Sequence, residues 1–108
     1  MKKPLIALAA AAFCFNFNAS ADADQAKADW NRHCKKCHGE DGSANTALGK
    51  RLEIADYTKA ESLAEFSDED LFNMTKDGVE GTKMPGYADK LSDEAIHALV
   101  AYMRAMAK

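Results

Sequence analysis

Two cysteines and a histidine lie within five residues of one another, in the run Cys34-Lys35-Lys36-Cys37-His38. A Cys-x-x-Cys-His run is the attachment signature of c-type haem. The two thiols would add across the haem vinyl groups and form thioethers, because two intervening residues on a helical turn match the spacing of those groups. His38 follows at once and would bring its imidazole under the iron as the proximal ligand. Its neutral Nε2 would bind the metal while Nδ1–H donates to a carbonyl.

Two other uses of a close cysteine pair compete with haem attachment. A thioredoxin-type redox pair lies next to a βαβ pattern, which this sequence lacks. Half of a zinc site needs a second Cys or His pair at zinc spacing, and His33 and His97 do not supply one. Cys34 and Cys37 are also too close in sequence to hold distant segments together as a disulfide. One covalently bound haem c, with its iron, is therefore the expected cofactor.

Met84 is the predicted distal ligand of that iron. It stands before Pro85 and Gly86, which interrupt helices, so it has no helix face to join. Pro85 also favours an extended backbone at Met84, which directs its side chain off the loop. Methionine usually fills a hydrophobic core or lies on the surface. One of these two positions is expected for each of the other candidates: Met74, Met103 and Met106. His97 is the competing ligand, although a surface position is expected for it. A His/Met pair would occupy both iron faces and raise the reduction potential.

Residues 1–21 are predicted to be a cleaved secretory signal peptide. They combine a basic start, an uncharged stretch over residues 4–17 and an Ala-x-Ala end at Ala21. The uncharged stretch is shorter than the roughly 20 apolar residues of a membrane anchor. A lipoprotein site at Cys14 would need a small residue in place of Phe13. Cleavage would remove Lys2 and Lys3 from the 14 basic residues and leave 12 against 17 acidic ones, a formal charge of −5. Periplasmic export is expected.

Residues 22–108 are predicted to form one all-α domain. The 108-residue chain is too short for a multidomain enzyme, its 47% apolar content is too high for disorder, and no long basic run indicates nucleic-acid binding. The expected elements are a helix capped by Asp22 or Asp24, a polar loop over 39–49 with Gly49 as a breaker, a short helix within 59–66, a helix from Ser67 to Gly78, a loop over 78–89 and a last helix capped by Ser92.

The last helix has the clearest pattern. Ile96, Leu99, Val100 and Met103 follow the i, i+3, i+4, i+7 spacing of one apolar stripe, with His97 and Arg104 directed to solvent. Large apolar residues are few elsewhere, and a domain this small has a thin energetic margin. The haem is therefore expected to serve as part of the core.

With these motifs together the chain resembles a class I c-type cytochrome, of the small bacterial monohaem kind with His/Met ligation. That family carries a small residue, an aromatic and the first haem cysteine at four-residue spacing, as Ala26, Trp30 and Cys34 do here. Its last helix carries Leu-x-x-Tyr, matched by Leu99 and Tyr102, and its distal ligand precedes a proline. The resemblance implies three to five helices around one haem c, with the first helix packed across the last.

The resemblance also implies a function. The protein is expected to be a soluble periplasmic electron-transfer protein, not an enzyme, that docks transiently with other redox proteins of an electron-transport chain. It is expected to be monomeric, without a membrane span after cleavage and without nucleic acid. Two alternatives stay open: a cytochrome subunit of a larger oxidoreductase, and an open-site haem protein that binds gas or peroxide.

One departure from the family concerns His38. Many members have a proline after the haem histidine whose carbonyl accepts the Nδ1–H bond, and residues 39–56 contain none. Family members also hold the haem propionates with polar side chains, for which Arg51, Tyr57 and Lys83 are candidates against the alternative that each is merely exposed. A basic ring around the haem edge is a further hypothesis, based on Lys35, Lys36, Lys50, Arg51, Lys83 and Lys90.

Overall fold

The computed structural model describes residues 19–108, and these contain no β-strand. The elements in chain order are α1 (Ala19–His33), α2 (Lys35–His38), α3 (Ala47–Leu52), the 3₁₀ turn η1 (Ala60–Ser62), α4 (Asp68–Asp77) and α5 (Asp93–Arg104). The predicted all-α fold of three to five helices is confirmed. The predicted signal peptide lies outside the described residues except for residues 19–21, which belong to α1. No helix in the described part of the chain is both long enough and apolar enough to cross a bilayer.

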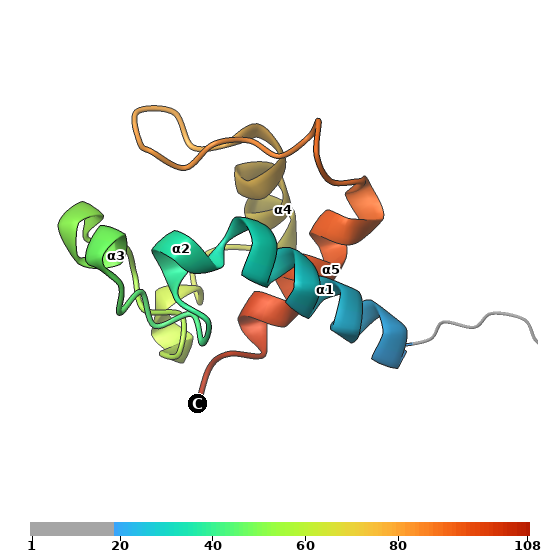
Figure 1. Ribbon diagram of the computed structural model, residues 1–108, viewed down its shortest axis with the longest axis horizontal. Coiled ribbons are helices and arrows are strands. Elements are labelled where there is room, and N and C mark those ends of the chain that lie inside the picture. The colour runs from blue at the N-terminus through green and yellow to red at the C-terminus, as the bar shows by residue number, and fades with distance from the viewer. Residues whose placement is uncertain (1–18) are drawn as a thin grey trace, which may run out of the picture.

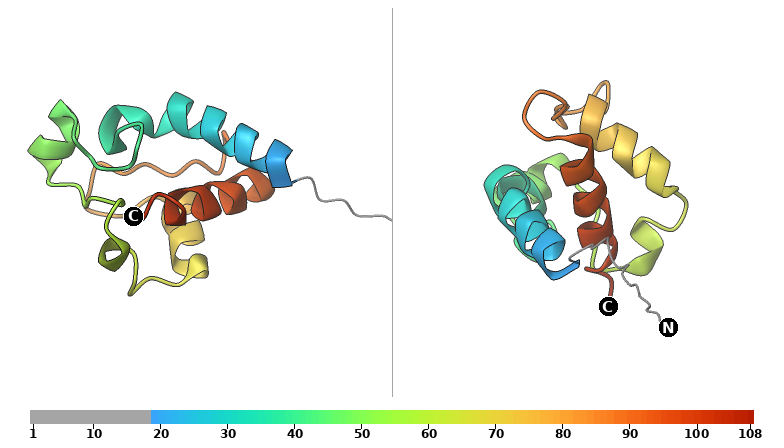
Figure 2. Two further views of the ribbon diagram at one scale, coloured as in Figure 1. Left: turned by 90° about the horizontal axis from the view of Figure 1, so that it is seen from below. Right: turned by 90° about the vertical axis from the view of Figure 1, so that its right-hand side faces the viewer.

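Helix α1 crosses α5, and α4 packs on α5 as well (Figures 1 and 2). Trp30 and Leu99 are almost completely buried in this crossing, and the Trp30 and Tyr102 rings lie 5.9 Å apart. The stripe predicted for the last helix is confirmed, since all four of its residues are buried. The crossing therefore joins the two ends of the domain and fixes the helix that leads into Cys34.

Local capping signals correctly locate the starts of α4 and α5. Ser67 accepts a hydrogen bond from the Asp70 amide, and the Asp70 carboxylate accepts one from the Ser67 amide, which completes a capping box. Ser92 caps α5 through the Ala95 amide. These bonds involve residues three apart, so the sequence alone contains the whole signal.

The short helix expected within 59–66 is a three-residue 3₁₀ helix. Three other expectations about the elements are wrong. Helix α1 begins at Ala19, before Asp22 and Asp24, because Ala19–Ala21 continue the helix without a break. Gly49 lies inside α3 and does not end a helix. Arg104 is directed to protein rather than solvent: its guanidinium donates to the carbonyls of Leu63 and Phe66 and to the Asp68 carboxylate.

Candidate functional site

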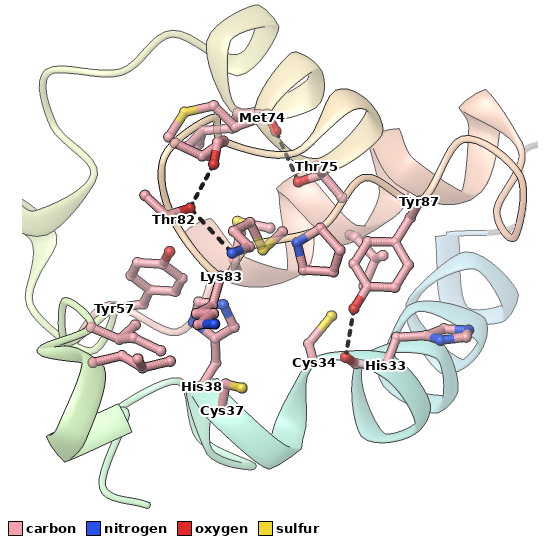
Figure 3. A pocket seen from close by; sticks show the side chains of 18 of the residues that line it. His33, Cys34, Cys37, His38, Tyr57, Met74, Thr75, Thr82, Lys83 and Tyr87 are labelled. Atoms are coloured by element: carbon pink, nitrogen blue, oxygen red, sulfur yellow. Dashed lines mark hydrogen bonds between the residues drawn. The ribbon is translucent and has the colours of Figure 1, made fainter. Parts of the chain in front are cut away.

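A cavity of about 670 Å³ lies between the α1–α2 segment, the loop after α4, and helices α4 and α5 (Figure 3). Its volume falls in the range of about 300–1,000 Å³ typical of small-molecule and cofactor sites. All four residues predicted to hold the cofactor line it: Cys34, Cys37, His38 and Met84. Three of them come from one short helical segment and the fourth from a loop more than 40 residues later in the chain.

The short segment after α1 presents both cysteines and His38 to the cavity. The His38 and Cys37 amides both donate to the Cys34 carbonyl, so the three residues share one helical turn. Cys34 is buried and Cys37 half-buried, and both are free thiols. Burial, aided by the charge of Asp29, raises the pKa of the Cys34 thiol to about 12, which keeps it protonated at neutral pH.

Aromatic rings hold the imidazole of His38. Tyr57 stacks on it at a centroid distance of 5.2 Å and an angle of 23°, and Trp30 lies at 5.5 Å. Burial lowers the pKa of His38, which favours the neutral form that ligates metals. Its Nδ1 is buried and has no hydrogen-bond partner among the described residues. The nearby Gly39 carbonyl accepts from Trp30 Nε1 at 2.8 Å.

The chain after His38 is shaped by residues that the sequence analysis did not single out. The Thr46 hydroxyl donates to the Cys37 carbonyl at 2.8 Å and accepts from the Gly49 amide, which caps α3. Gly49 lies so close to Cys37 that a Cβ atom there would come within 2.8 Å of the Cys37 carbonyl oxygen. A threonine three residues before Gly49 is an ordinary N-cap signal that could have revealed Thr46.

The two ends of the loop that carries Met84 lie close together. A Cβ at Gly78, whose φ is +82°, would lie 2.8 Å from the Gly86 nitrogen, and one at Gly86 would lie 2.7 Å from the Lys76 oxygen. Glycines at both positions therefore let the two sides of the loop meet backbone to backbone. Within the loop the Val79 amide donates to the Met84 carbonyl. Met84 is half-buried and has no helix around it, as predicted.

Other candidate ligands differ in position. Met103 is buried as expected and also lines the cavity, as does the half-buried Met74, which Figure 3 shows at the α4 side of the cavity. Met106 packs instead against Gly42. His97 is exposed, does not line the cavity and stacks on Phe72 at 4.3 Å. Met74 and Met103 are thus the structural competitors of Met84.

The three candidates for polar contact with the haem differ in whether they line the cavity. Tyr57 and Lys83 line the cavity, and burial raises the pKa of the Tyr57 phenol, so it remains protonated. Arg51 is exposed on α3 and does not line the cavity, which agrees with the alternative interpretation of that residue. Tyr87 and Thr82, which the sequence analysis did not select, also line it.

The residues present fit a haem with covalent attachment. The lining is mainly apolar and aromatic, two thiols and a neutral imidazole come from one turn, and a thioether comes from a separate loop. Within residues 19–108 no group of three or more His, Cys, Asp or Glu side chains could hold a bare metal ion.

The chain is similar to known proteins. A family described as cytochrome C oxidase, cbb3-type, subunit III matches residues 21–103. Among solved structures, the KustC0563 c-type cytochrome is 34% identical with a TM-score of 0.69, over 77% of this chain and 98% of that one. A tyrosine-to-phenylalanine mutant of Kustc0563 is 33% identical with a TM-score of 0.67, over 76% and 98% of the two chains. A search of curated protein sequences found no match.

A larger assembly also contains this fold. A chain of the Kuenenia stuttgartiensis reducing HAO-like protein complex Kustc0457/Kustc0458 superposes with a TM-score of 0.72 at 22% identity. The similarity covers 82% of the present chain and 44% of that chain. At this identity the likeness concerns the fold alone.

Proposed function

The chain belongs to the c-type cytochrome family described as subunit III of cbb3-type cytochrome c oxidase, and we propose that it is a one-electron carrier built on a single haem c. Cys34 and Cys37 would form the two thioethers. His38 would be the proximal ligand and Met84 the distal one. When bound, the haem supplies an iron that cycles between its ferrous and ferric states and so takes up and returns one electron.

One observation carries this proposal. His38 and Met84 line the same cavity from segments that share no element, so both residues could hold one haem bound there. Burial lowers the pKa of His38 and so favours the neutral imidazole, which could bind the iron. With His38 and Met84 both as ligands, the iron would have no position left for a substrate, which favours a carrier over an enzyme.

The optical spectrum of the reduced holoprotein, recorded before and after addition of carbon monoxide, tests the ligation. We expect no spectral change in the native protein and rapid carbon monoxide binding in M84A. M74A is the matched control, because Met74 also lines the cavity. This variant should show no spectral change when carbon monoxide is added. Rapid binding by the native protein would instead support an open-site haem protein, and binding by M74A alone would make Met74 the ligand.

A subunit role is the second candidate function. It is favoured by the matching family, whose description names an oxidase subunit. Purification of the tagged protein from its native cell, followed by size analysis, distinguishes the two. A free carrier elutes as a monomer, whereas a subunit retains stoichiometric partners through ion-exchange and size-exclusion steps.

Export through the signal peptide completes the proposal. Cleavage after Ala21 would release residues 22–108 into the periplasm. There the protein would exchange electrons with its redox partners. The intact mass of the purified holoprotein tests this directly. A mass equal to residues 22–108 plus one haem is expected, and a mass that retains residues 1–21 would contradict it.

A further inference from the structure

Two side-chain hydroxyls hold the loop on either side of Met84. Before it, Thr82 Oγ1 accepts a hydrogen bond from the Met84 amide at 3.1 Å and donates to the Val79 carbonyl at 2.7 Å. After it, the Tyr87 hydroxyl donates to the His33 carbonyl at 3.1 Å (Figure 3). The first hydroxyl sets the local turn, and the second ties the loop to the end of the helix that leads into Cys34.

Tyr87 joins three parts of the site. Its amide donates to the Thr75 carbonyl near the end of α4, at 3.0 Å. Its ring lines the cavity and lies 5.4 Å from the His33 ring. Burial raises the pKa of its phenol, so the hydroxyl keeps the proton that it donates to His33. Loop, α4 and α1 therefore meet at one residue.

Few protein side chains pack against the tip of this loop, which lies along the cavity. Gly81, Thr82, Lys83 and Pro85 all line the cavity, and a Cβ built at Gly81 would meet no other protein atom within 4 Å. A segment with few buried contacts opens locally more easily than the helices around it. Apart from a group bound in the cavity, the hydrogen bonds of the two hydroxyls therefore hold the loop on both sides of Met84.

We propose that Thr82 and Tyr87 are positioning residues whose hydroxyls set how often the Met84 loop opens, and thereby how well the site excludes small diatomic ligands. This inference rests on the proposed role of Met84 as the distal ligand. When the loop is closed, the Met84 thioether would hold the iron. When the loop opens, an external ligand could bind in its place, and apparent affinity would scale with the open fraction.

Carbon monoxide binding to the reduced holoprotein tests the inference with Y87F and T82V. Y87F keeps the ring and removes only the hydroxyl, and T82V keeps the shape of the side chain. Loss of one neutral hydrogen bond should raise the open fraction by about two- to tenfold, and the rate and apparent affinity of carbon monoxide binding should rise by the same factor.

Y102F is the matched control. Tyr102 is half-buried and packs on Trp30, but it does not line the cavity. Its variant should change carbon monoxide binding by less than either test variant, even if it lowers the denaturant midpoint as much. A merely structural role for Tyr87 would make Y87F and Y102F alike in both measurements.

The outcomes separate the two proposals. If the native protein binds carbon monoxide far more slowly than M84A, and each test variant binds it as slowly as the native protein, the positioning role is wrong while Met84 ligation stands. If only one variant changes, the other hydroxyl has no such role. If the native protein binds as fast as M84A, Met84 ligation fails, and the positioning role with it. Haem content is measured for each variant, and the two variants are evaluated independently.

Discussion

Gly49 lies where α3 presses against the chain that carries Cys37. A Cβ at this position would come within 2.2 Å of the Ala44 oxygen and 2.8 Å of the Cys37 oxygen, both of which are backbone atoms. Backbone cannot move aside as the end of a flexible side chain can. Close approach, rather than helix termination, is therefore the reason for glycine here.

We expect G49A to destabilise the holoprotein by about 1–3 kcal/mol, the usual cost of overpacking. Helix propensity alone predicts the opposite, a gain of up to about 1 kcal/mol. Urea denaturation followed by haem absorbance measures the difference. K50A, on the exposed neighbouring position, should change the free energy of unfolding by less than about 0.5 kcal/mol. A G49A protein as stable as K50A would show that the close contact has no energetic weight.

Local sequence patterns predict single residues of the site. The spacing of Cys34, Cys37 and His38 and the proline after Met84 select four residues, and all four line one cavity. The contacts of Tyr57 and Tyr87 are invisible at that level, because they depend on residues 19 and 54 positions away: Tyr57 stacks on His38, and Tyr87 bonds to His33. Pairing across such separations is set by the fold.

At the scale of elements, the side chain of Arg104 joins α5 to the chain that precedes α4. Its guanidinium donates to two backbone carbonyls, those of Leu63 and Phe66, and at 2.6 Å to the Asp68 carboxylate. Helical periodicity placed Arg104 off the apolar stripe correctly. It could not reveal that a loop more than 35 residues earlier covers that face.

R104A should therefore lower the free energy of unfolding by about 1–3 kcal/mol, because hydrogen bonds from a charged donor are lost at two carbonyls. D68N should cost less than about 1 kcal/mol, since the Asp68 side chain is 75% exposed and surface ion pairs contribute little. Thermal and urea unfolding of both holoproteins measure this. Equal losses in the two variants would mean that the ion pair, and not the carbonyl contacts, joins the elements.

At the scale of the molecule, the cavity lies where a larger domain would have its core. The largest fully buried side chains are Trp30, Ile96 and Leu99, and all of them belong to α1 or α5 rather than to the loops. The 39–66 segment and the loop after α4 both line the cavity, the former through Leu52, Ile54 and Tyr57. The group that fills the cavity would therefore connect them.

We expect a chain without haem to lose most of its helical structure. A group that binds only the folded state stabilises that state, so its removal withdraws the stabilisation. The double variant C34A/C37A, expressed without haem attachment, isolates this effect, and far- and near-ultraviolet circular dichroism record it. The native holoprotein is the control. A variant that unfolds cooperatively with native-like near-ultraviolet dichroism would show that residues 19–108 form a sufficient core alone.

The effect of the basic side chains near the cavity can be distinguished from the effect of the protein's negative net charge. Exposed basic side chains occur on α2, on α3 and on the loop after α4, as Lys35, Lys36, Lys50, Arg51 and Lys83. Lys90 also stands in that loop, but it lies 3.8 Å from Asp89 and so is partly neutralised. Of these, only Lys83 lines the cavity itself.

We therefore expect K83E to slow oxidation of the ferrous protein by hexacyanoferrate(III), a trivalent anion that takes one electron, and to weaken the dependence of that rate on added salt. K27E is the control with the same change in net charge. Lys27 is exposed near the middle of α1 and does not line the cavity. Stopped-flow rates at low and high ionic strength measure both variants. Because the net charge of the two is identical, equal slowing would mean that the molecule's total charge governs electron transfer, whereas a larger effect of K83E would place electron transfer at the cavity mouth.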